Sequence, residues 1–249
     1  MSGHSHWAGI KHKKAANDAK RGKVWSKIAR TIIVAAKNGG GDPSQNLALR
    51  YAIDKAKAAN MPKDTIEKAV KKGAGSGDTV SFVSILYEGY APGGIAMMAD
   101  VLTDNRQRTA PEIRKIFEHF GGTLGSTGCV NYLFSKKGLF TVPLTAIKED
   151  DLMELALSAG AEDIKNTGSV YEITCEPAAF DELKKTLDEK KIPTEVAELS
   201  MLPQNSVPVT DIEKARKILA IMEEFEEHDD VQNVYANFDI PDDIIAKLQ

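Results

Sequence analysis

The chain has 249 residues, of which 42% are hydrophobic and 27% are charged. This is an ordinary composition for a folded protein, and the length favours two or three domains over a single hydrophobic core. No apolar run is long enough to cross a membrane, and the first residues lack the apolar core of a signal peptide. We therefore expect a cytoplasmic protein with no membrane partner. Two cysteines, Cys129 and Cys175, are too few for a disulfide framework, so we expect reduced thiols, although one bridge between them stays open.

The net charge of −4 hides an uneven distribution along the chain. Residues 1–78 contain 16 Lys and Arg against 6 Asp and Glu, a net charge of +10, whereas the remainder contains 16 against 30, a net charge of −14. Such a division is typical of a nucleic-acid contact surface on an otherwise acidic protein. The alternative is that the basic helices dock on an acidic domain of the same chain.

The basic segment is predicted to be helical after a mobile arm that ends near Lys20. The first helix carries Trp25, Ile28 and Ile32 at helical spacing and ends at the glycines of residues 39–41. Asp42 and Pro43 have the pattern of an N-cap and a first helical residue, and this second helix continues to residue 60. A third helix runs from residue 62 to residue 73. A flexible glycine-rich linker, residues 73–78, then precedes alternating β-type sequence.

Strands and helices alternate in the acidic remainder. Residues 136–202 are expected to follow the order β-α-β-β-α-β, which is typical of a ferredoxin-like fold, with a tight hairpin turn at residues 166–168. The flanking sequence supplies a second set of such elements around this insertion. Its predicted strands are 80–87, 95–103, two short ones within 123–134, and 231–237; its helices are 110–120 and 212–226.

The predicted fold class is therefore α+β and multidomain. An N-terminal helical bundle is followed by two ferredoxin-like α+β domains, the third inserted in the second. The expected divisions are residues 1–78 for the arm and three-helix bundle, 79–135 plus 203–249 for the second domain with an extra first strand, and 136–202 for the inserted domain.

The arm and first helix supply most of the candidate nucleic-acid-binding residues, because clustered cations attract phosphates and release counterions. An indole can also stack on an unpaired base, although Trp25 has the spacing of a core residue. Two arginines in the loop before the helix at 110–120 add a candidate anion site, with Thr103 or Asp104 as a possible cap. The full set is His4, His6, Trp7, Lys11, His12, Lys13, Lys14, Lys20, Arg21, Lys23, Lys27, Arg30, Arg106 and Arg108.

The sequence gives less support to a metal site, a phosphate-binding loop or catalysis. His4, His6 and His12 lack the nearby ligands of a structural zinc site, so no metal is expected. The glycine-rich residues 121–128 follow a helix and lack a P-loop lysine, which favours tight turns over a phosphate cradle. No catalytic motif is present, so we expect a protein that is not an enzyme and needs no cofactor. The sequence is compatible with a monomer but does not fix the oligomeric state.

Several motifs together resemble the YebC family over essentially the whole chain. They are MSGHSHWAGIKHKK at residues 1–14, NMPKD at 60–64, YEGYAPGG at 87–94, TDNR at 103–106, GGTLGSTG at 121–128 and FSKKG at 134–138. Small departures lie at His6, Gln107 and Cys129. The resemblance implies a three-domain cytoplasmic regulator that binds DNA. Other members are similar to translation factors, so ribosomal RNA or the ribosome is the alternative partner.

Overall fold

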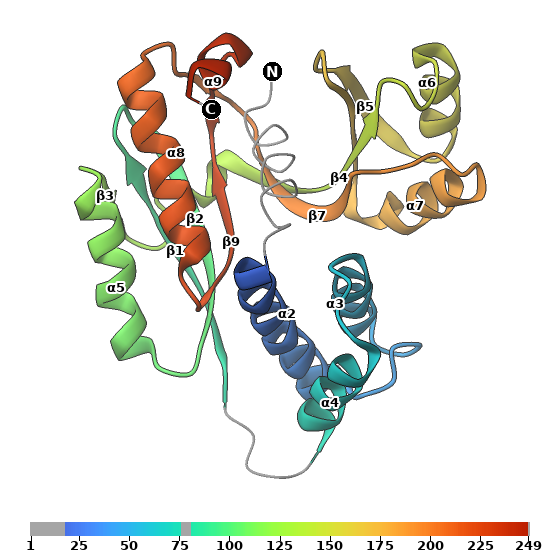
Figure 1. Cartoon of the computed structure of the whole chain (residues 1–249), viewed down its shortest axis with the longest axis horizontal. Coiled ribbons are helices and arrows are strands. Elements are labelled where there is room, and N and C mark those ends of the chain that lie inside the picture. Colours follow the sequence, from blue (N-terminus) through green and yellow to red (C-terminus); the bar gives the residue numbers. More distant parts are fainter. Residues whose placement is uncertain (1–17, 76–80, 249) are drawn as a thin grey trace.

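The computed structural model describes residues 18–75 and 81–248, with the backbone alone at 18–21, 242, 243 and 246. Within these residues three helices come first and are followed by two antiparallel four-stranded sheets, each covered on one face by two helices (Figure 1). The predicted mixed α and β content is confirmed. Among the described residues no helix is both long and apolar enough to span a bilayer.

The three helices pack around a small apolar core that includes Ile32, Ala36 and Leu49. They are α2 (Asp18–Gly39), α3 (Leu47–Ala58) and α4 (Lys63–Ala74). The predicted start of the second helix was wrong. Asn46 caps α3 by accepting a hydrogen bond from the amide of Leu49, while Asp42 accepts from Ser44 within the preceding turn. An Asx turn thus satisfies Asp42 locally, before the helix begins.

Gly73 lies in α4 where that helix touches α2. A Cβ at this position would come within 2.3 Å of the Ile33 carbonyl oxygen and 2.8 Å of the Ala36 Cβ. We expect Gly73→Ala to lower the free energy of unfolding by about 1–2 kcal/mol, because the helices must move apart. Gly22→Ala is the control, since it meets no atom within 4 Å and gains helix propensity. Urea unfolding that ranked both variants alike would show that the close approach has no energetic weight.

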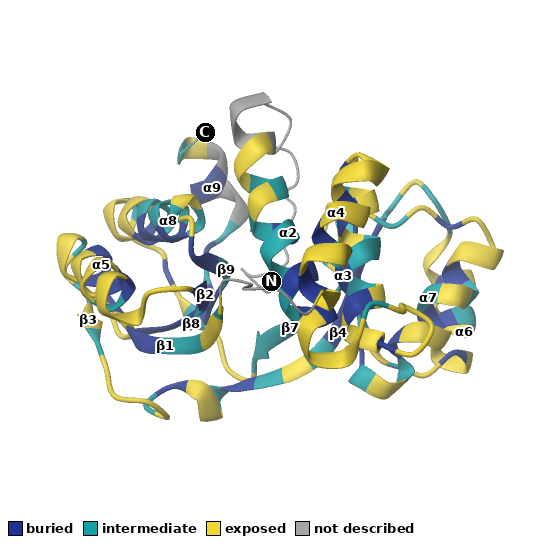
Figure 2. Ribbon diagram, turned by 90° about the horizontal axis from the view of Figure 1, so that it is seen from below, coloured by how far each residue is buried: buried dark blue, intermediate teal, exposed yellow. Residues whose placement is uncertain are grey.

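The first sheet has the strand order β3-β1-β2-β9, and helices α5 and α8 cover one of its faces (Figure 1). Its core lies between this face and the two helices, whose inner sides are buried (Figure 2). The core includes Met97, Phe117 and Phe225. The elements are β1 (Val83–Ala91), β2 (Ile95–Thr103), α5 (Arg106–His119), β3 (Thr123–Leu124), α8 (Ile212–Glu227) and β9 (Val231–Ala236). The extra first strand therefore lies inside this sheet, between β3 and β2.

The second sheet has the order β5-β6-β4-β7, and every neighbouring pair is antiparallel. The β-α-β-β-α-β succession expected for residues 136–202 matches the observed elements, and Gly168 takes the positive φ of the hairpin turn. These elements are β4 (Phe134–Pro143), α6 (Glu149–Ser158), β5 (Ala161–Asn166), β6 (Val170–Cys175), α7 (Phe180–Glu189) and β7 (Val196–Pro203).

The connections between the sheets depart from the prediction. The second of the two short strands expected within residues 123–134 was wrong, because Asn131–Leu133 form a short 3₁₀ helix and Phe134 already belongs to β4. β4 runs without interruption through residue 136, where the sequence placed a division. Three elements had no counterpart in the prediction: the parallel pair β8 (Val207–Pro208) and β10 (Phe238–Asp239), and helix α9 (Asp242–Leu248).

The helical bundle contacts both sheet-bearing parts. On one side, α3 meets α7: Tyr51 donates a hydrogen bond to Asp181, and its ring packs edge-on against Phe180. Arg50 pairs with the same carboxylate at 2.6 Å. On the other side, α2 lies against the end of α8 and the start of β9 (Figure 1). The bundle is thereby held at two places.

Candidate nucleic-acid interface

Nine of the fourteen predicted contact residues have no side-chain description. His4, His6, Trp7, Lys11, His12, Lys13 and Lys14 lie outside the described residues, as does most of the predicted arm. The side chains of Lys20 and Arg21 also lie outside, although their backbone belongs to α2. Residues 76–78 of the predicted linker also lie outside the described residues. The assignment of these nine histidine, tryptophan, lysine and arginine residues as nucleic-acid contacts stays a prediction.

Three predicted contact residues of α2 instead hold the end of α8. Lys23 donates to the carbonyl oxygen of Glu227, Lys27 to that of Glu226, and Arg30 to that of Asp229 at 2.8 Å. Positions 23, 27 and 30 share one face of a helix, and these carbonyls lie at the negative end of the α8 dipole. The docking of basic helices on the same chain, left open by the sequence, therefore accounts for these three cations in this conformation.

Asp230 is the centre of this contact. Its side chain is only 5% exposed, and its two oxygens accept from Arg30 Nη1 at 2.8 Å and from Arg108 Nη2 at 2.7 Å. Thr109 donates a further hydrogen bond at 2.8 Å. Burial alone would raise the pKa of Asp230, but the bonds from Arg108 and Thr109 outweigh it and hold the pKa below its ordinary value. This carboxylate ties α2 to α5 and β9.

The predicted anion site before α5 thus holds an internal anion, the Asp230 carboxylate. The predicted cap at Thr103 or Asp104 was wrong: Asn105 accepts from the Arg108 amide and caps the helix. Arg108 also pairs with Asp104. Arg106 is exposed and makes no hydrogen bond or ion pair within the described residues, so it is the member of this loop whose charge faces solvent.

A second internal carboxylate fills the glycine-rich loop. Glu88 is 3% exposed and accepts hydrogen bonds from the backbone amides of Gly128, Val130 and Asn131 at 2.7–2.9 Å. Burial tends to raise the pKa of Glu88, yet these three bonds together keep it below the ordinary value. Because the amides of Gly121, Gly122, Gly125 and Gly128 donate to acceptors within the chain, the structure favours tight turns here over a phosphate cradle.

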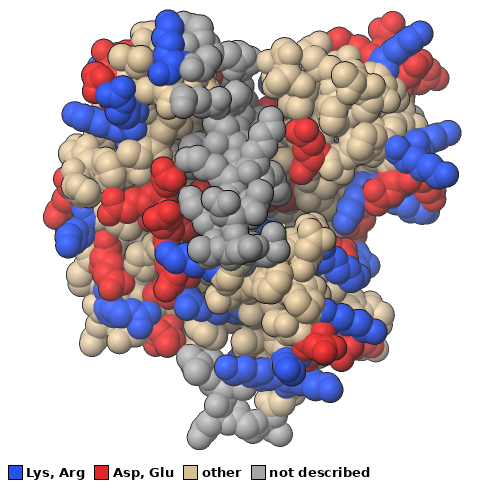
Figure 3. Space-filling view, viewed as in Figure 1, with Lys and Arg blue, Asp and Glu red and all other residues tan. Residues whose placement is uncertain are grey.

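Sequence reasoning missed a group of lysines on α4. Ile66 and Ala69 turn inward, and the opposite side of the helix is exposed. Gly73 and Gly41 pack near the end of α2, which brings Lys37 to the same end of the bundle. Figure 3 shows basic side chains gathered over α4. We call the following exposed residues, which have no ion pair within the described part of the chain, the α4 basic surface: Lys37, Lys68, Lys71 and Lys72.

The remaining candidates have structural roles. Trp25 donates from Nε1 to the carbonyl oxygen of Ala59 and packs on the bundle core, as its spacing favoured. Both cysteines are free thiols; Cys175 is buried, and burial raises its pKa to about 11, while Cys129 is half-buried. In residues 18–75 and 81–248 no three His, Cys, Asp or Glu side chains are grouped to hold a metal ion.

Family models and curated proteins match this chain over most of its length. Residues 5–76 match a family model described as the TACO1/YebC protein N-terminal domain, and residues 82–238 match one described as the TACO1/YebC second and third domain. A protein of Dictyoglomus thermophilum is 52% identical over 249 residues and all of both chains, and one of Elusimicrobium minutum is 49% identical over 248. Both are named probable transcriptional regulatory protein.

A solved structure agrees with these relatives. The crystal structure of a conserved hypothetical protein from Aquifex aeolicus is similar with a TM-score of 0.85 and 47% identity, over 95% of this chain and 97% of that one. Similarity of sequence and of structure both extend over nearly the full length. The chain therefore belongs to the TACO1/YebC family, in which these two relatives carry the name probable transcriptional regulatory protein.

Proposed function

We propose that the protein is a cytoplasmic regulator of gene expression that binds DNA through its basic N-terminal part and performs no catalysis. The observation that carries the proposal is the charge division, +10 in residues 1–78 against −14 in the rest. The structure adds the four lysines of the α4 basic surface, which are exposed and not neutralised by described carboxylates. The names of the relatives support a regulatory role.

We propose that nucleic acid contacts the arm and the α4 basic surface, and that the docked face of α2 takes no part in binding. Lys23, Lys27 and Arg30 are engaged by α8 and Asp230 in this conformation. The lysines of α4 present point charges that bind phosphates without reading bases. Binding is therefore expected to depend on salt more than on sequence.

Ribosomal RNA is the second candidate partner. α4 has no Arg, Asn or Gln, the side chains that most often read base edges in a major groove. Arg50 of α3 and Arg30 of α2 are held by Asp181 and Asp230. An arm with histidines and a tryptophan suits irregular RNA better than a regular duplex. Sucrose-gradient sedimentation with ribosomes tests this: protein confined to the top fractions at low and moderate salt would exclude the ribosomal partner.

Charge reversal tests the proposed surface. We expect Lys13→Glu, Lys14→Glu and Arg21→Glu, combined in one variant, to weaken binding uniformly across sequences. The slope of log affinity against log salt concentration should fall by about one unit per lost phosphate contact. A second variant, reversing Lys68, Lys71 and Lys72, is expected to act in the same direction. Fluorescence anisotropy with labelled duplex DNA and with RNA over a salt series gives both quantities.

The matched control reverses three exposed cations of the acidic part, Arg114, Lys115 and Lys148, and so changes the net charge equally. It separates local phosphate contacts from the overall charge of the molecule. Equal loss in this control would assign the effect to net charge. Unchanged affinity and slope in both N-terminal variants would overturn the proposal.

A further inference from the structure

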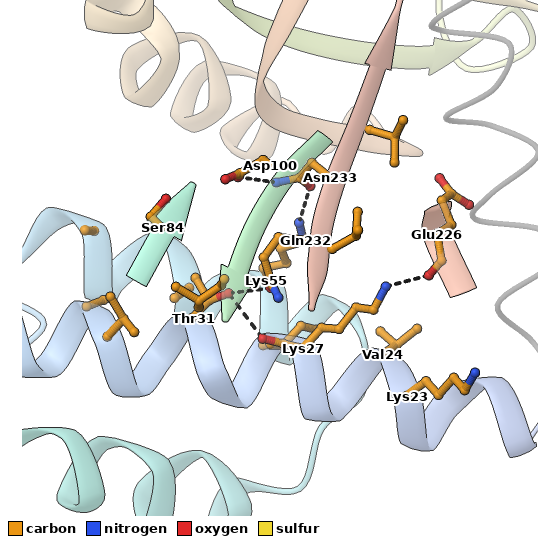
Figure 4. Close-up of a pocket in the computed structure, with 18 of the residues that line it drawn as sticks. Lys23, Val24, Lys27, Thr31, Lys55, Ser84, Asp100, Glu226, Gln232 and Asn233 are labelled. Carbon is orange, nitrogen blue, oxygen red and sulfur yellow. Dashed lines mark hydrogen bonds between the residues drawn. The ribbon is translucent and has the colours of Figure 1, made fainter. Parts of the chain in front are cut away.

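A cavity of about 620 Å³ lies between α2, α3 and the face of the first sheet that α5 and α8 leave uncovered (Figure 4). Val24 and Ile28 of α2 and Leu102 of β2 contribute apolar walls. Pockets of this volume, with mostly apolar walls and a few polar groups, are typical of small-molecule binding sites. Neither Asp230 nor any lysine of the α4 basic surface lines the cavity, whereas the docked Lys23 and Lys27 lie on its wall.

A β-bulge concentrates polar side chains at one end of this cavity. β2 pairs Asp100 with Asn233 and then Val101 with Val231, so Gln232 of β9 is an extra residue. Consecutive strand residues ordinarily point to opposite faces, but here Gln232 and Asn233 both line the cavity beside Asp100 (Figure 4). Bulges re-aim side chains in this way and are common next to binding sites.

The hydrogen bonds of this polar end are incomplete. Asn233 donates to one oxygen of Asp100 at 3.3 Å, and Lys55 approaches the Asn233 side-chain oxygen at 3.5 Å. Gln232 accepts from Thr31, but its buried amide nitrogen has no acceptor among the described residues. Burial raises the pKa of Asp100 against the opposing effects of Asn233 and Lys55. The site therefore favours a partner that gives hydrogen-bond donors to the Asp100 carboxylate.

We propose that this cavity binds a guanine base. Guanine presents two neighbouring donors, N1–H and N2–H₂, which match the two oxygens of Asp100. The apolar walls take the faces of the ring. Adenine, uracil and cytosine do not offer two adjacent donors. Four carboxylates, those of Asp100, Glu223, Glu226 and Glu227, line the cavity against three lysines; this disfavours phosphates inside it, so the base alone enters.

Isothermal titration of the full chain with guanosine and inosine tests the site, because inosine lacks the N2 amino group. The wild type is expected to bind guanosine at least tenfold more tightly than inosine. Asp100→Asn should reduce this preference to within about twofold, since the amide does not accept from both donors. A merely structural role of Asp100 would weaken both nucleosides equally and leave the ratio unchanged. The exposed Asp188→Asn is the control and should keep the preference.

The source of the base is decided by a second pair of probes. A single-stranded oligouridine RNA with one central guanosine is compared with the same RNA containing inosine. Preference in the RNA assigns the base to nucleic acid, and preference with the free nucleosides alone assigns it to a small molecule; either supports the site. The proposal does not rest on the basic arm, so the Lys13, Lys14 and Arg21 variant should bind guanosine as the wild type does. No preference for guanosine over inosine in the wild type, either with the free nucleosides or within the RNA, overturns it.

Discussion

Replacing Asp230 by alanine is expected to lower the free energy of unfolding by about 3 kcal/mol, as found when one partner of a buried ion pair is removed. The change leaves Arg30 and Arg108 without the carboxylate that each contacts at less than 3 Å, and Thr109 without its acceptor. Arg30 lies on α2 and Arg108 on α5, so the loss is expected at the contact between the bundle and the first sheet. The second sheet should be little affected.

Urea unfolding gives the total loss, and amide hydrogen exchange shows where it falls. We expect the exchange of α2 amides to quicken more than that of β4 and β6. Asp229→Ala is a matched control, because its side chain is exposed and Arg30 contacts only its carbonyl oxygen, which alanine keeps. A loss below about 1 kcal/mol for Asp230→Ala would place this pair among ordinary surface ion pairs. Equal effects at both positions would remove the special role of the buried carboxylate.

The parts of the fold with local signals were predictable from the sequence. The strand at Ile95–Thr103 was placed to the residue, because an almost continuous apolar run follows the turn at Gly93 and Gly94. The 3₁₀ helix at Asn131–Leu133 was missed because its conformation depends on Glu88, about forty residues earlier. Nor does local pattern show that β1 lies between β3 and β2, since pairing between distant strands decides it.

The candidate site also has parts that local sequence signals predict and parts that depend on distant residues. The sequence identified the cations of α2, but their partners at Glu226, Glu227 and Asp230 lie about 200 residues away. Charge counting does not separate a docked lysine from an exposed one. The lysines of α4 had a usable local signal, because Lys68, Lys71 and Lys72 lie on the side of the helix opposite Ile66 and Ala69. No local signal in the sequence marks the bulge at Gln232.

Glu88→Gln is expected to lower the free energy of unfolding by about 2 kcal/mol at neutral pH. A glutamine keeps one oxygen, but its amide nitrogen faces a backbone N–H, so one of the amides of Gly128, Val130 and Asn131 loses its acceptor. The remaining bonds also lose the strength that the charge supplies. Glu118→Gln, at an exposed position of α5, is the control and should be nearly neutral.

The loss should depend on pH in one direction. The pKa of Glu88 is lowered in the folded protein, so its contribution is fully present above the unfolded pKa of about 4.3 and disappears as the pH falls through the folded pKa. The stability difference between wild type and Glu88→Gln should therefore be constant near neutrality and shrink in acid. Urea unfolding at a series of pH values measures it. A difference that stayed constant well below pH 4.3 would mean that side-chain shape, and not the carboxylate charge, holds the loop at the start of β4.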